Sequence, residues 1–194
     1  MKRSKNRKEE IYAVAAKLFR KRGYVASTMR DIAEIVGIEP SSLYSHIKSK
    51  EEILINICTA CAREFDEGMQ RVLNSKLSNP EKIEALIDLH LDIAYHKPSS
   101  VTVFDDEWRH LPEKELKIFL KERNAYEANF KSILEDGMNN GDFLPLSHST
   151  AFQLIINCVK WVHYYSKKMT KDQFEEKRKD IKSFISRGLF SEMN

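Results

Sequence analysis

The chain has 194 residues, of which 42% are hydrophobic, and its formal net charge at pH 7 is +3. This hydrophobic content supports a folded core, and the scattered six glycines and five prolines exclude a collagen-like or low-complexity chain. No apolar run is long enough to cross a membrane, and no apolar signal region follows the basic start, so we expect a cytoplasmic protein that does not engage membranes. Three cysteines, an odd number, favour reduced thiols over a disulfide framework.

Positive charge is concentrated at the start of the sequence. Residues 1–50 carry a net charge of +7, and the remaining residues carry −4. A basic segment joined to an acidic body is typical of a protein that binds phosphate at one end only, although a basic tail can also be a solvated surface.

The first helix is predicted upstream of residue 23. Gly23 is placed to end it in the left-handed conformation, with Tyr24 folding back on Phe19. The apolar residues that recur at helical spacing are Ile11, Val14, Ala15, Leu18 and Phe19.

Two short helices joined by a tight turn are predicted next. The first has one apolar face, made of Ile32, Ala33, Ile35 and Val36. Thr28 is a good N-cap with Asp31 three residues later, and Gly37 supplies the left-handed residue that ends this helix. Pro40 fits the first position of the second helix, which we expect to run to His46. Such a pair is a helix-turn-helix, whose second helix can enter the major groove of DNA.

A further helix begins at the capping box Ser49-Lys50-Glu51-Glu52. Over about the first sixty residues, the order of helix, helix-turn-helix and helix resembles the DNA-binding domain of the TetR family of bacterial repressors. The matching residues are Ser27-Thr28, Ile32-Ala33, Gly37-Ile38, Leu43-Tyr44, His46 and Lys50-Glu51-Glu52. Three positions depart from the family pattern. Val36 and Ile47 keep apolar character, whereas Glu39 changes what the second helix offers to a base.

The residues expected to contact DNA lie around the second helix of the pair. The hydroxyls of Ser41, Ser42 and Ser45 can reach base edges or phosphates, and the carboxylate of Glu39 can accept from a cytosine amine. Arg30 can contact either a base edge or a phosphate. The predicted DNA-binding set is Ser27, Thr28, Arg30, Glu39, Pro40, Ser41, Ser42, Tyr44, Ser45, His46 and Lys50.

Phosphate contacts are expected at the far end of that helix and beyond it. Tyr44, His46 and Lys50 offer a phenol, an imidazole and an ammonium there, and Thr28 offers a hydroxyl beside helix N-terminal amides. For Tyr44 the alternative is a half-buried core aromatic.

Every segment beyond residue 65 has helical periodicity, so the predicted fold is all-α. We expect a three-helix helix-turn-helix domain over residues 4–64 and a helical regulatory and dimerisation domain over residues 65–194. The helices expected in the second domain cover residues 80–95, 101–110, 112–136, 151–165 and 174–189.

The segment 151–165 is apolar nearly all round, so its helix must be buried on two faces. Pairing of this helix and the 174–189 helix with their twins in a second subunit would cover the surplus surface, as the family resemblance also implies. The alternative is that 151–165 is the central core helix of a monomer.

Two polar residues interrupt apolar stripes in the second domain. Arg123 lies seven residues from both Leu116 and Phe130, and His90 follows Ile87 at helical spacing, so both are expected to point inward. A buried arginine needs either an anionic ligand or a carboxylate. The candidate carboxylates are Asp106, Glu107 and Glu127. The predicted ligand site consists of His90, Phe104, Trp108, Phe119, Arg123, Tyr126, Phe130, Trp161 and Tyr165.

Weaker candidate sites also occur. Cys58 and Cys61 have CxxC spacing within a helix, where the two alternatives are a redox-sensing pair and small hydrophobic filling of an apolar face. Asp88, Asp92 and His96 share one helix face, either as metal ligands or as a solvated polar face.

The residues from Glu107 to Phe143 are similar to TetR-family members whose inducers are acyl-CoA thioesters. Together these features predict a homodimeric regulator that binds a palindromic operator in double-stranded DNA. A small inducer with an apolar part and an anionic or carbonyl head would release it. No cofactor or metal is expected. The alternative is a ligand-independent DNA-binding or nucleoid-associated protein. An enzyme is not expected, because the chain has no Ser-His-Asp set, phosphate-binding glycine loop or HExxH motif.

Overall fold

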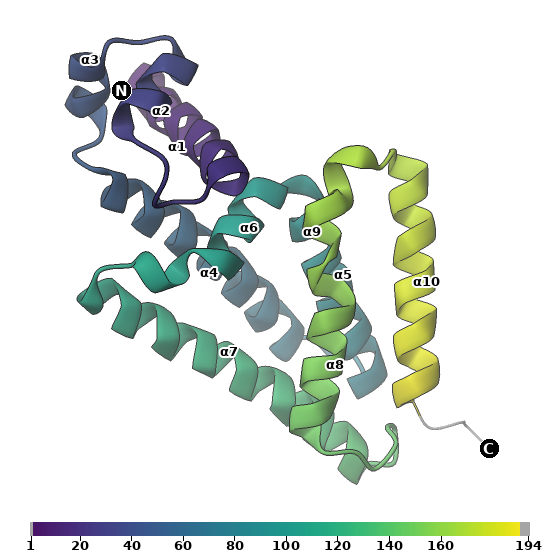
Figure 1. Ribbon diagram of the computed structural model, residues 1–194. Coiled ribbons are helices and arrows are strands. Elements are labelled where there is room, and N and C mark those ends of the chain that lie inside the picture. Colours follow the sequence, from purple (N-terminus) through teal and green to yellow (C-terminus); the bar gives the residue numbers. More distant parts are fainter. Residues whose placement is uncertain (1, 191–194) are drawn as a thin grey trace. The chain divides into compact units, whose positions relative to one another are not determined.

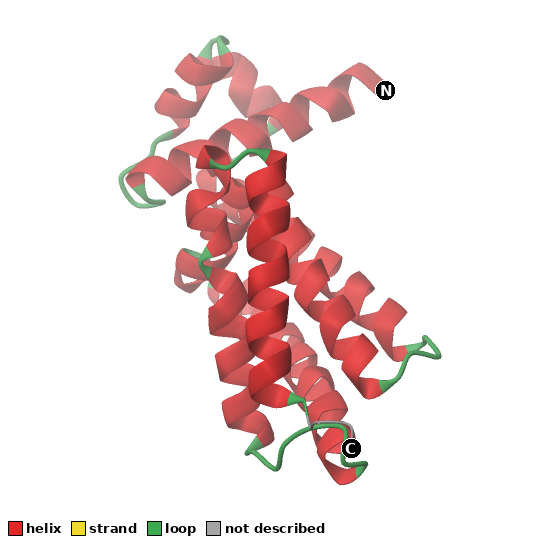
Figure 2. Ribbon diagram, turned by 90° about the vertical axis from the view of Figure 1, so that its right-hand side faces the viewer, coloured by secondary structure: helices red, strands yellow, loops and turns green. Residues whose placement is uncertain are grey.

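The computed structural model describes residues 2–190, except for the side chains of residues 2–6 and 167. Within this range the chain consists of helices and loops, apart from one isolated antiparallel bridge between Phe143 and Phe190 (Figure 2). The predicted all-α fold is confirmed. The helices labelled in Figure 1 are α1 Lys2–Arg22, α2 Met29–Val36, α3 Pro40–His46, α4 Lys50–Leu73, α5 Asn79–His96, α6 Pro98–Asp106, α7 Glu113–Asn139, α8 His148–Lys160, α9 Val162–Tyr165 and α10 Lys171–Leu189.

The helices form two compact units. The N-terminal unit contains the residues up to Arg63 and a second segment, Ser99–Leu120. The C-terminal unit contains Glu64–Pro98 and the residues from Lys121 onward. The predicted domain boundary after residue 64 lies next to the position, between Arg63 and Glu64, where the chain first passes from the N-terminal unit to the C-terminal unit. The segment Ser99–Leu120, which carries α6, a short 3-10 helix and the start of α7, packs within the N-terminal unit.

The helix-turn-helix is built as its capping signals predict. The Thr28 hydroxyl accepts from the backbone N–H of Asp31, and the Asp31 carboxylate accepts from the backbone N–H of Thr28, which completes a capping box on α2. Gly37 ends α2 with φ at 74°, in the left-handed region that a residue with Cβ disfavours. Pro40 occupies the first turn of α3.

The core of the N-terminal unit joins both of its chain segments. The prediction that Ile35 belongs to the apolar face of α2 is wrong, because its side chain is 57% exposed while Ile32 is fully buried. Helix α2 has only eight residues, and one of its sides packs against α1 and α3. Ile35 lies next to that side and not on it. The core residues include Ile11, Ala15, Phe19, Ile32, Leu43, Ile53, Leu54, Val103, Leu111 and Phe119.

In the C-terminal unit, α5, α8 and α10 pack against one another (Figure 1). One side of α5 faces the core of this unit, since Ile83, Leu86 and Ile87 are buried. The stretch expected as one helix over 151–165 is instead divided at Trp161 into α8 and α9. No described helix is both long and apolar enough to span a membrane.

A close approach inside α7 gives a stability prediction. A Cβ built at Gly137 would lie well inside van der Waals contact of the buried Phe143 ring, whereas one built at Gly188 in α10 would meet open space among the described residues. We expect Gly137→Ala to lower the free energy of unfolding by about 1–3 kcal/mol, because a rigid ring must move. The matched change Gly188→Ala should change it by between zero and about 1 kcal/mol in the stabilising direction, from helix propensity. Urea unfolding monitored by circular dichroism measures both, and equal stabilities of the two variants would contradict the packing at Gly137.

Candidate DNA-binding site and candidate ligand site

The recognition helix α3 turns its polar residues to solvent. Leu43 is fully buried and anchors the helix, while Tyr44 is 53% exposed. Tyr44 does not belong to the core of the N-terminal unit, and its phosphate contact stays a prediction. The other exposed residues at this helix are Glu39, Pro40, Ser41, Ser42 and Ser45. The Ser45 hydroxyl donates to the backbone carbonyl of Ser42 at 2.7 Å, which leaves its lone pairs available as acceptors.

The start of α2 is partly occupied by its own hydrogen bonds. The Thr28 hydroxyl donates to the Asp31 carboxylate at 2.6 Å, and hydrogen bonds from Thr28 hold the pKa of Asp31 below its usual value. Ser27 is buried, and its hydroxyl donates to the carbonyl of Gly23 at 2.7 Å. The capping signal in the sequence predicted the pairing of Thr28 with Asp31, whereas nothing in the sequence signalled the bond of the Ser27 hydroxyl. Arg30 is exposed, and His46 is partly buried.

Lys50 is held in a cage of backbone carbonyls. Its ammonium donates to the carbonyls of Tyr24 and Ser27, both at 2.8 Å, and lies 4.3 Å from the centre of the Tyr24 ring. A phosphate contact would compete with these bonds. The phosphate contact predicted for Lys50 stays a prediction. The structure adds hydrogen bonds from Lys50 to the carbonyls of Tyr24 and Ser27, which the sequence did not reveal.

The residues predicted for the ligand site belong to both units. Phe104, Trp108 and Phe119 form an aromatic cluster in the N-terminal unit, with ring centres 5.2 Å apart for Phe104–Phe119 and 5.8 Å apart for Trp108–Phe119. This cluster packs against the core of that unit.

The C-terminal unit contains a polar pair among aromatic rings. His90 Nε2 and Tyr126 Oη are joined by a hydrogen bond of 2.8 Å, and the Phe65 ring lies 4.7 Å from the His90 ring. Burial lowers the pKa of His90 to about 4, so its imidazole is neutral at pH 7, and burial together with Asp66 raises the pKa of Tyr126. The prediction did not include Phe65, although it follows Cys61 at helical spacing along the apolar side of α4.

The remaining predicted ligand residues have different surroundings. Phe130 is fully buried and packs edge-to-face on Phe152 in the core. Trp161 and Tyr165 lie edge-to-face with their ring centres 5.9 Å apart, and Tyr165 is 53% exposed.

The prediction that Arg123 points into the protein is wrong, because its side chain is exposed. Residues 121–125 of α7 are all exposed in the described part of the chain, so this stretch is not buried despite the register of position 123 with Leu116 and Phe130. Among the carboxylates considered as partners, Glu127 pairs with Lys131 at 2.6 Å, and Glu107 pairs with His110 at 3.5 Å.

The weaker candidates have structural roles. Asp88 and Asp92 on α5 form ion pairs with Arg178 of α10, and Asp88 also pairs with Lys182. No group of three or more His, Cys, Asp or Glu in the described part of the chain is placed to hold a metal ion. Burial, with a further contribution from Glu107, raises the pKa of the Cys58 thiol to about 12, which keeps it from forming the reactive thiolate.

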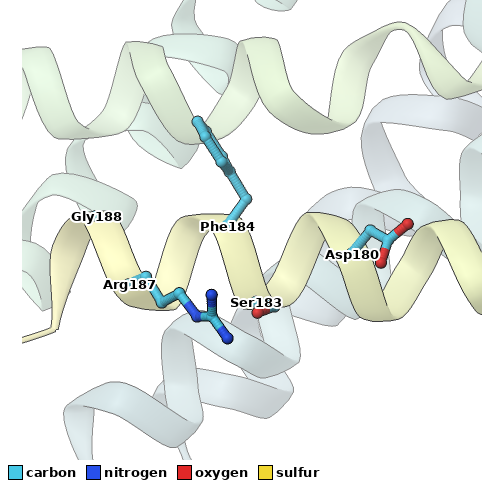
Figure 3. A pocket seen from close by; sticks show the side chains of 5 residues that line it. All are labelled: Asp180, Ser183, Phe184, Arg187 and Gly188. Atoms are coloured by element: carbon cyan, nitrogen blue, oxygen red, sulfur yellow. The ribbon is translucent and has the colours of Figure 1, made fainter.

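The surface of α8, α9 and α10 carries exposed apolar side chains. Phe184 is 72% exposed and Leu154 is 58% exposed, whereas Val159 is buried in the core. Phe184 projects from α10 beside an open groove that Asp180, Ser183, Arg187 and Gly188 also line (Figure 3). We use the term α8–α10 patch for Leu154, Tyr164, Tyr165 and Phe184.

The fold and the exposed recognition helix define a DNA-binding protein of the helix-turn-helix class. Residues 11–57 match the family described as bacterial regulatory proteins, tetR family, and residues 76–168 match the tetracyclin repressor-like C-terminal domain. The chain belongs to the TetR family of transcriptional regulators. Members of this family are transcription factors and not enzymes, which confirms the prediction that the chain is not an enzyme.

Individual relatives agree with this assignment. The chain is 31% identical over 145 residues to the HTH-type transcriptional repressor KstR2 of Mycolicibacterium smegmatis, and the alignment covers 72% of this chain and 69% of the relative. The structure of the ketosteroid transcriptional regulator KstR2 of Mycobacterium tuberculosis matches with a TM-score of 0.89 at 22% identity, covering 96% of each chain. The structure of AibR in complex with isovaleryl coenzyme A and operator DNA matches with a TM-score of 0.79 at 19% identity, covering 93% of this chain and 96% of that chain.

Proposed function

We propose that this TetR-family regulator is a homodimeric repressor that binds a palindromic operator and is released by a small amphipathic ligand, an acyl-CoA thioester in the first instance. The names of two relatives support this proposal. KstR2 is a repressor, and AibR is described in complex with both isovaleryl coenzyme A and operator DNA. Its site of action would be the cytoplasm, where an operator is accessible.

The single observation that carries the DNA-binding half is the exposed face of α3, anchored by the fully buried Leu43. Ser41 and Ser42 offer hydroxyls to base edges, and the exposed Glu39 carboxylate can accept from a base amine. Tyr44 and Arg30 would contact phosphates, which position the helix without reading sequence.

A pair of substitutions separates phosphate contacts from base contacts. Tyr44→Phe is expected to weaken operator and random DNA by the same factor, about tenfold, because one hydrogen bond to a charged group is lost. Ser42→Ala is expected to change the preference at one base pair by roughly 1–3 kcal/mol and to leave random DNA unaffected. Fluorescence anisotropy with the operator and with its single-base variants measures both.

The matched control is Tyr95→Phe, since Tyr95 is stacked on Phe174 in the C-terminal unit. Equal affinities of the Tyr44→Phe and Tyr95→Phe proteins for all DNA would remove Tyr44 from the phosphate contacts. A salt series on a protein that lacks the Arg30 guanidinium tests that residue, because each lost ion contact reduces the magnitude of the slope of log K against log salt by about one.

Dimerisation is supported by the α8–α10 patch. A partner copy that covers this patch would bury its four side chains by twofold symmetry, in which the same patch serves both subunits. Two recognition helices about 34–36 Å apart would then reach successive major grooves.

The ligand-binding half is supported by the polar pair of His90 and Tyr126 beside Phe65. Neutral hydrogen-bonding groups among aromatic rings suit a carbonyl-bearing apolar chain. Arg123 lies one turn before Tyr126 on α7, on the same side of the helix, and its exposed guanidinium suits an anionic head held at the surface. In this arrangement Arg123 binds the head from solvent and not from within a core. Release of operator DNA by the ligand distinguishes this function from that of a ligand-independent DNA-binding protein.

A further inference from the structure

The loop Gly23–Ser27 connects α1 to the helix-turn-helix and is fixed by specific bonds. Gly23 has φ at 81°, and its N–H donates to the carbonyl of Phe19 at 2.7 Å, which closes α1 with a single bond. The Ser27 N–H donates to the carbonyl of Tyr24, and the Ser27 hydroxyl donates back to Gly23. Thr28, the N-cap of α2, follows directly, so the conformation of this loop sets where α2 begins.

The closing bond at Gly23 leaves the next N–H, that of Tyr24, without an acceptor in α1. Glu107 supplies this acceptor from the other segment of the N-terminal unit, with 3.0 Å between Tyr24 N and Glu107 Oε1. The Glu107 side chain is only 16% exposed, and it lies at the end of α6, where its own N–H donates to the carbonyl of Val103. A carboxylate that accepts from a backbone N–H in a poorly hydrated place makes a strong, directional bond.

Other groups restrain Tyr24 on its remaining sides. The Lys50 ammonium donates a hydrogen bond to the Tyr24 carbonyl and lies over the Tyr24 ring. The His110 ring stacks on the Tyr24 ring with 5.4 Å between centres, and His110 in turn faces Glu107. The backbone N–H, the carbonyl and the ring of Tyr24 are thus each held by a different side chain.

We propose that Glu107 is a positioning residue for DNA binding, which fixes the loop Gly23–Ser27 through the backbone N–H of Tyr24 and thereby holds α2 and α3 in their DNA-binding arrangement. Glu107 itself does not touch DNA. Removing its carboxylate releases Tyr24 on the N–H side, and the loop then samples conformations that displace the start of α2.

Three variants test this role. Glu107→Met removes the acceptor and keeps most of the side-chain volume. Glu107→Gln keeps a neutral acceptor, which accepts a bond roughly half as strong. Glu113→Met removes the same charge from an exposed position at the start of α7, where the Glu113 side chain is 83% exposed. This control corrects for the gain in DNA affinity that follows from removing any negative charge in the N-terminal unit.

Relative to Glu113→Met, the Glu107→Met protein is expected to bind operator and random DNA about tenfold more weakly, because a hydrogen bond to a charged group is lost. The slope of log K against log salt should be unchanged, since no phosphate contact is lost. In the free protein, the amide hydrogen of Tyr24 should exchange about tenfold faster, while the amide of Phe19 in α1 exchanges at its usual rate. Glu107→Gln should be intermediate in both affinity and exchange.

Several results would overturn the proposal. They are DNA affinity equal to that of Glu113→Met, unchanged exchange at Tyr24, or a salt slope whose magnitude falls by about one, which would make Glu107 act on a phosphate contact. If Glu107→Met does not fold, Glu107→Gln decides. Faster exchange at Tyr24 together with weaker DNA binding supports the role, and any other combination rejects it.

Discussion

Replacing Phe184 by glutamate is expected to convert the protein to monomers that bind the palindromic operator about 10²–10⁴-fold more weakly, because the second half-site contact is no longer intramolecular. Phe184 is 72% exposed on α10, so the substitution perturbs no core packing within one chain. In the proposed dimer, however, it places two carboxylates where apolar surfaces should meet. Sedimentation velocity at micromolar concentration measures the assembly state, and anisotropy with a full operator and a half-site measures the binding.

The control is Leu77→Glu, which makes the same kind of change at a leucine that is 39% exposed in the loop between α4 and α5. It should remain dimeric and bind operator normally. Leu154→Glu, on the other helix of the α8–α10 patch, should reproduce the effect of Phe184→Glu. A wild-type protein that sediments as a monomer, or a Phe184→Glu protein that stays dimeric, would contradict the proposed interface.

The local signals of the helix-turn-helix were sufficient to predict its structure. Thr28, Gly37 and Pro40 act through bonds and dihedral angles within four residues of themselves, so their effect can be deduced from the sequence. The buried face of α5 was predictable for a similar reason, since periodicity alone identifies which side of a helix is apolar.

Features that depend on distant segments could not be predicted in this way. The bond between Tyr24 and Glu107 joins positions 83 residues apart, and no spacing rule connects them. Lys50 was expected to face phosphate because of its place in the chain, but the carbonyls of Tyr24 and Ser27 surround its ammonium.

Arg123 illustrates the limit of periodicity along a long helix. A stripe of apolar residues defines a side of α7, but burial at each point also requires a neighbouring element on that side. Leu116 contributes to the core of the N-terminal unit and Phe130 to that of the C-terminal unit, while residues 121–125 between them are exposed. The heptad register was correct and the burial inferred from it was not.

Arg123→Ala is expected to leave operator affinity within about twofold and to raise the acyl-CoA concentration needed for half-release of the operator by about 10–100-fold, because charge-assisted hydrogen bonds to the anionic head are lost. A 100-fold loss of ligand affinity corresponds to roughly 2.7 kcal/mol, so ligand concentrations that release the wild-type protein would no longer release the variant. Since Arg123 is exposed, its truncation should leave the fold intact. Operator release is measured by anisotropy with a series of acyl-CoA thioesters, with coenzyme A and the corresponding free acids as ligand controls.

Lys121→Ala is the matched protein control, because it removes the same charge two residues away and on another side of α7. Equal sensitivity of the Arg123→Ala and Lys121→Ala proteins would remove Arg123 from the ligand site. Tyr126→Phe separates the apolar end from the anionic end, since it breaks the 2.8 Å hydrogen bond to His90 and leaves the guanidinium in place. If a carbonyl of the ligand uses this pair, Tyr126→Phe weakens the response to acyl-CoA, while the result with coenzyme A, which has no acyl carbonyl, equals that of the wild-type protein. If no acyl-CoA releases the wild-type protein from its operator, the ligand class is wrong, while the DNA-binding role of α3 is unaffected because it stands on separate contacts.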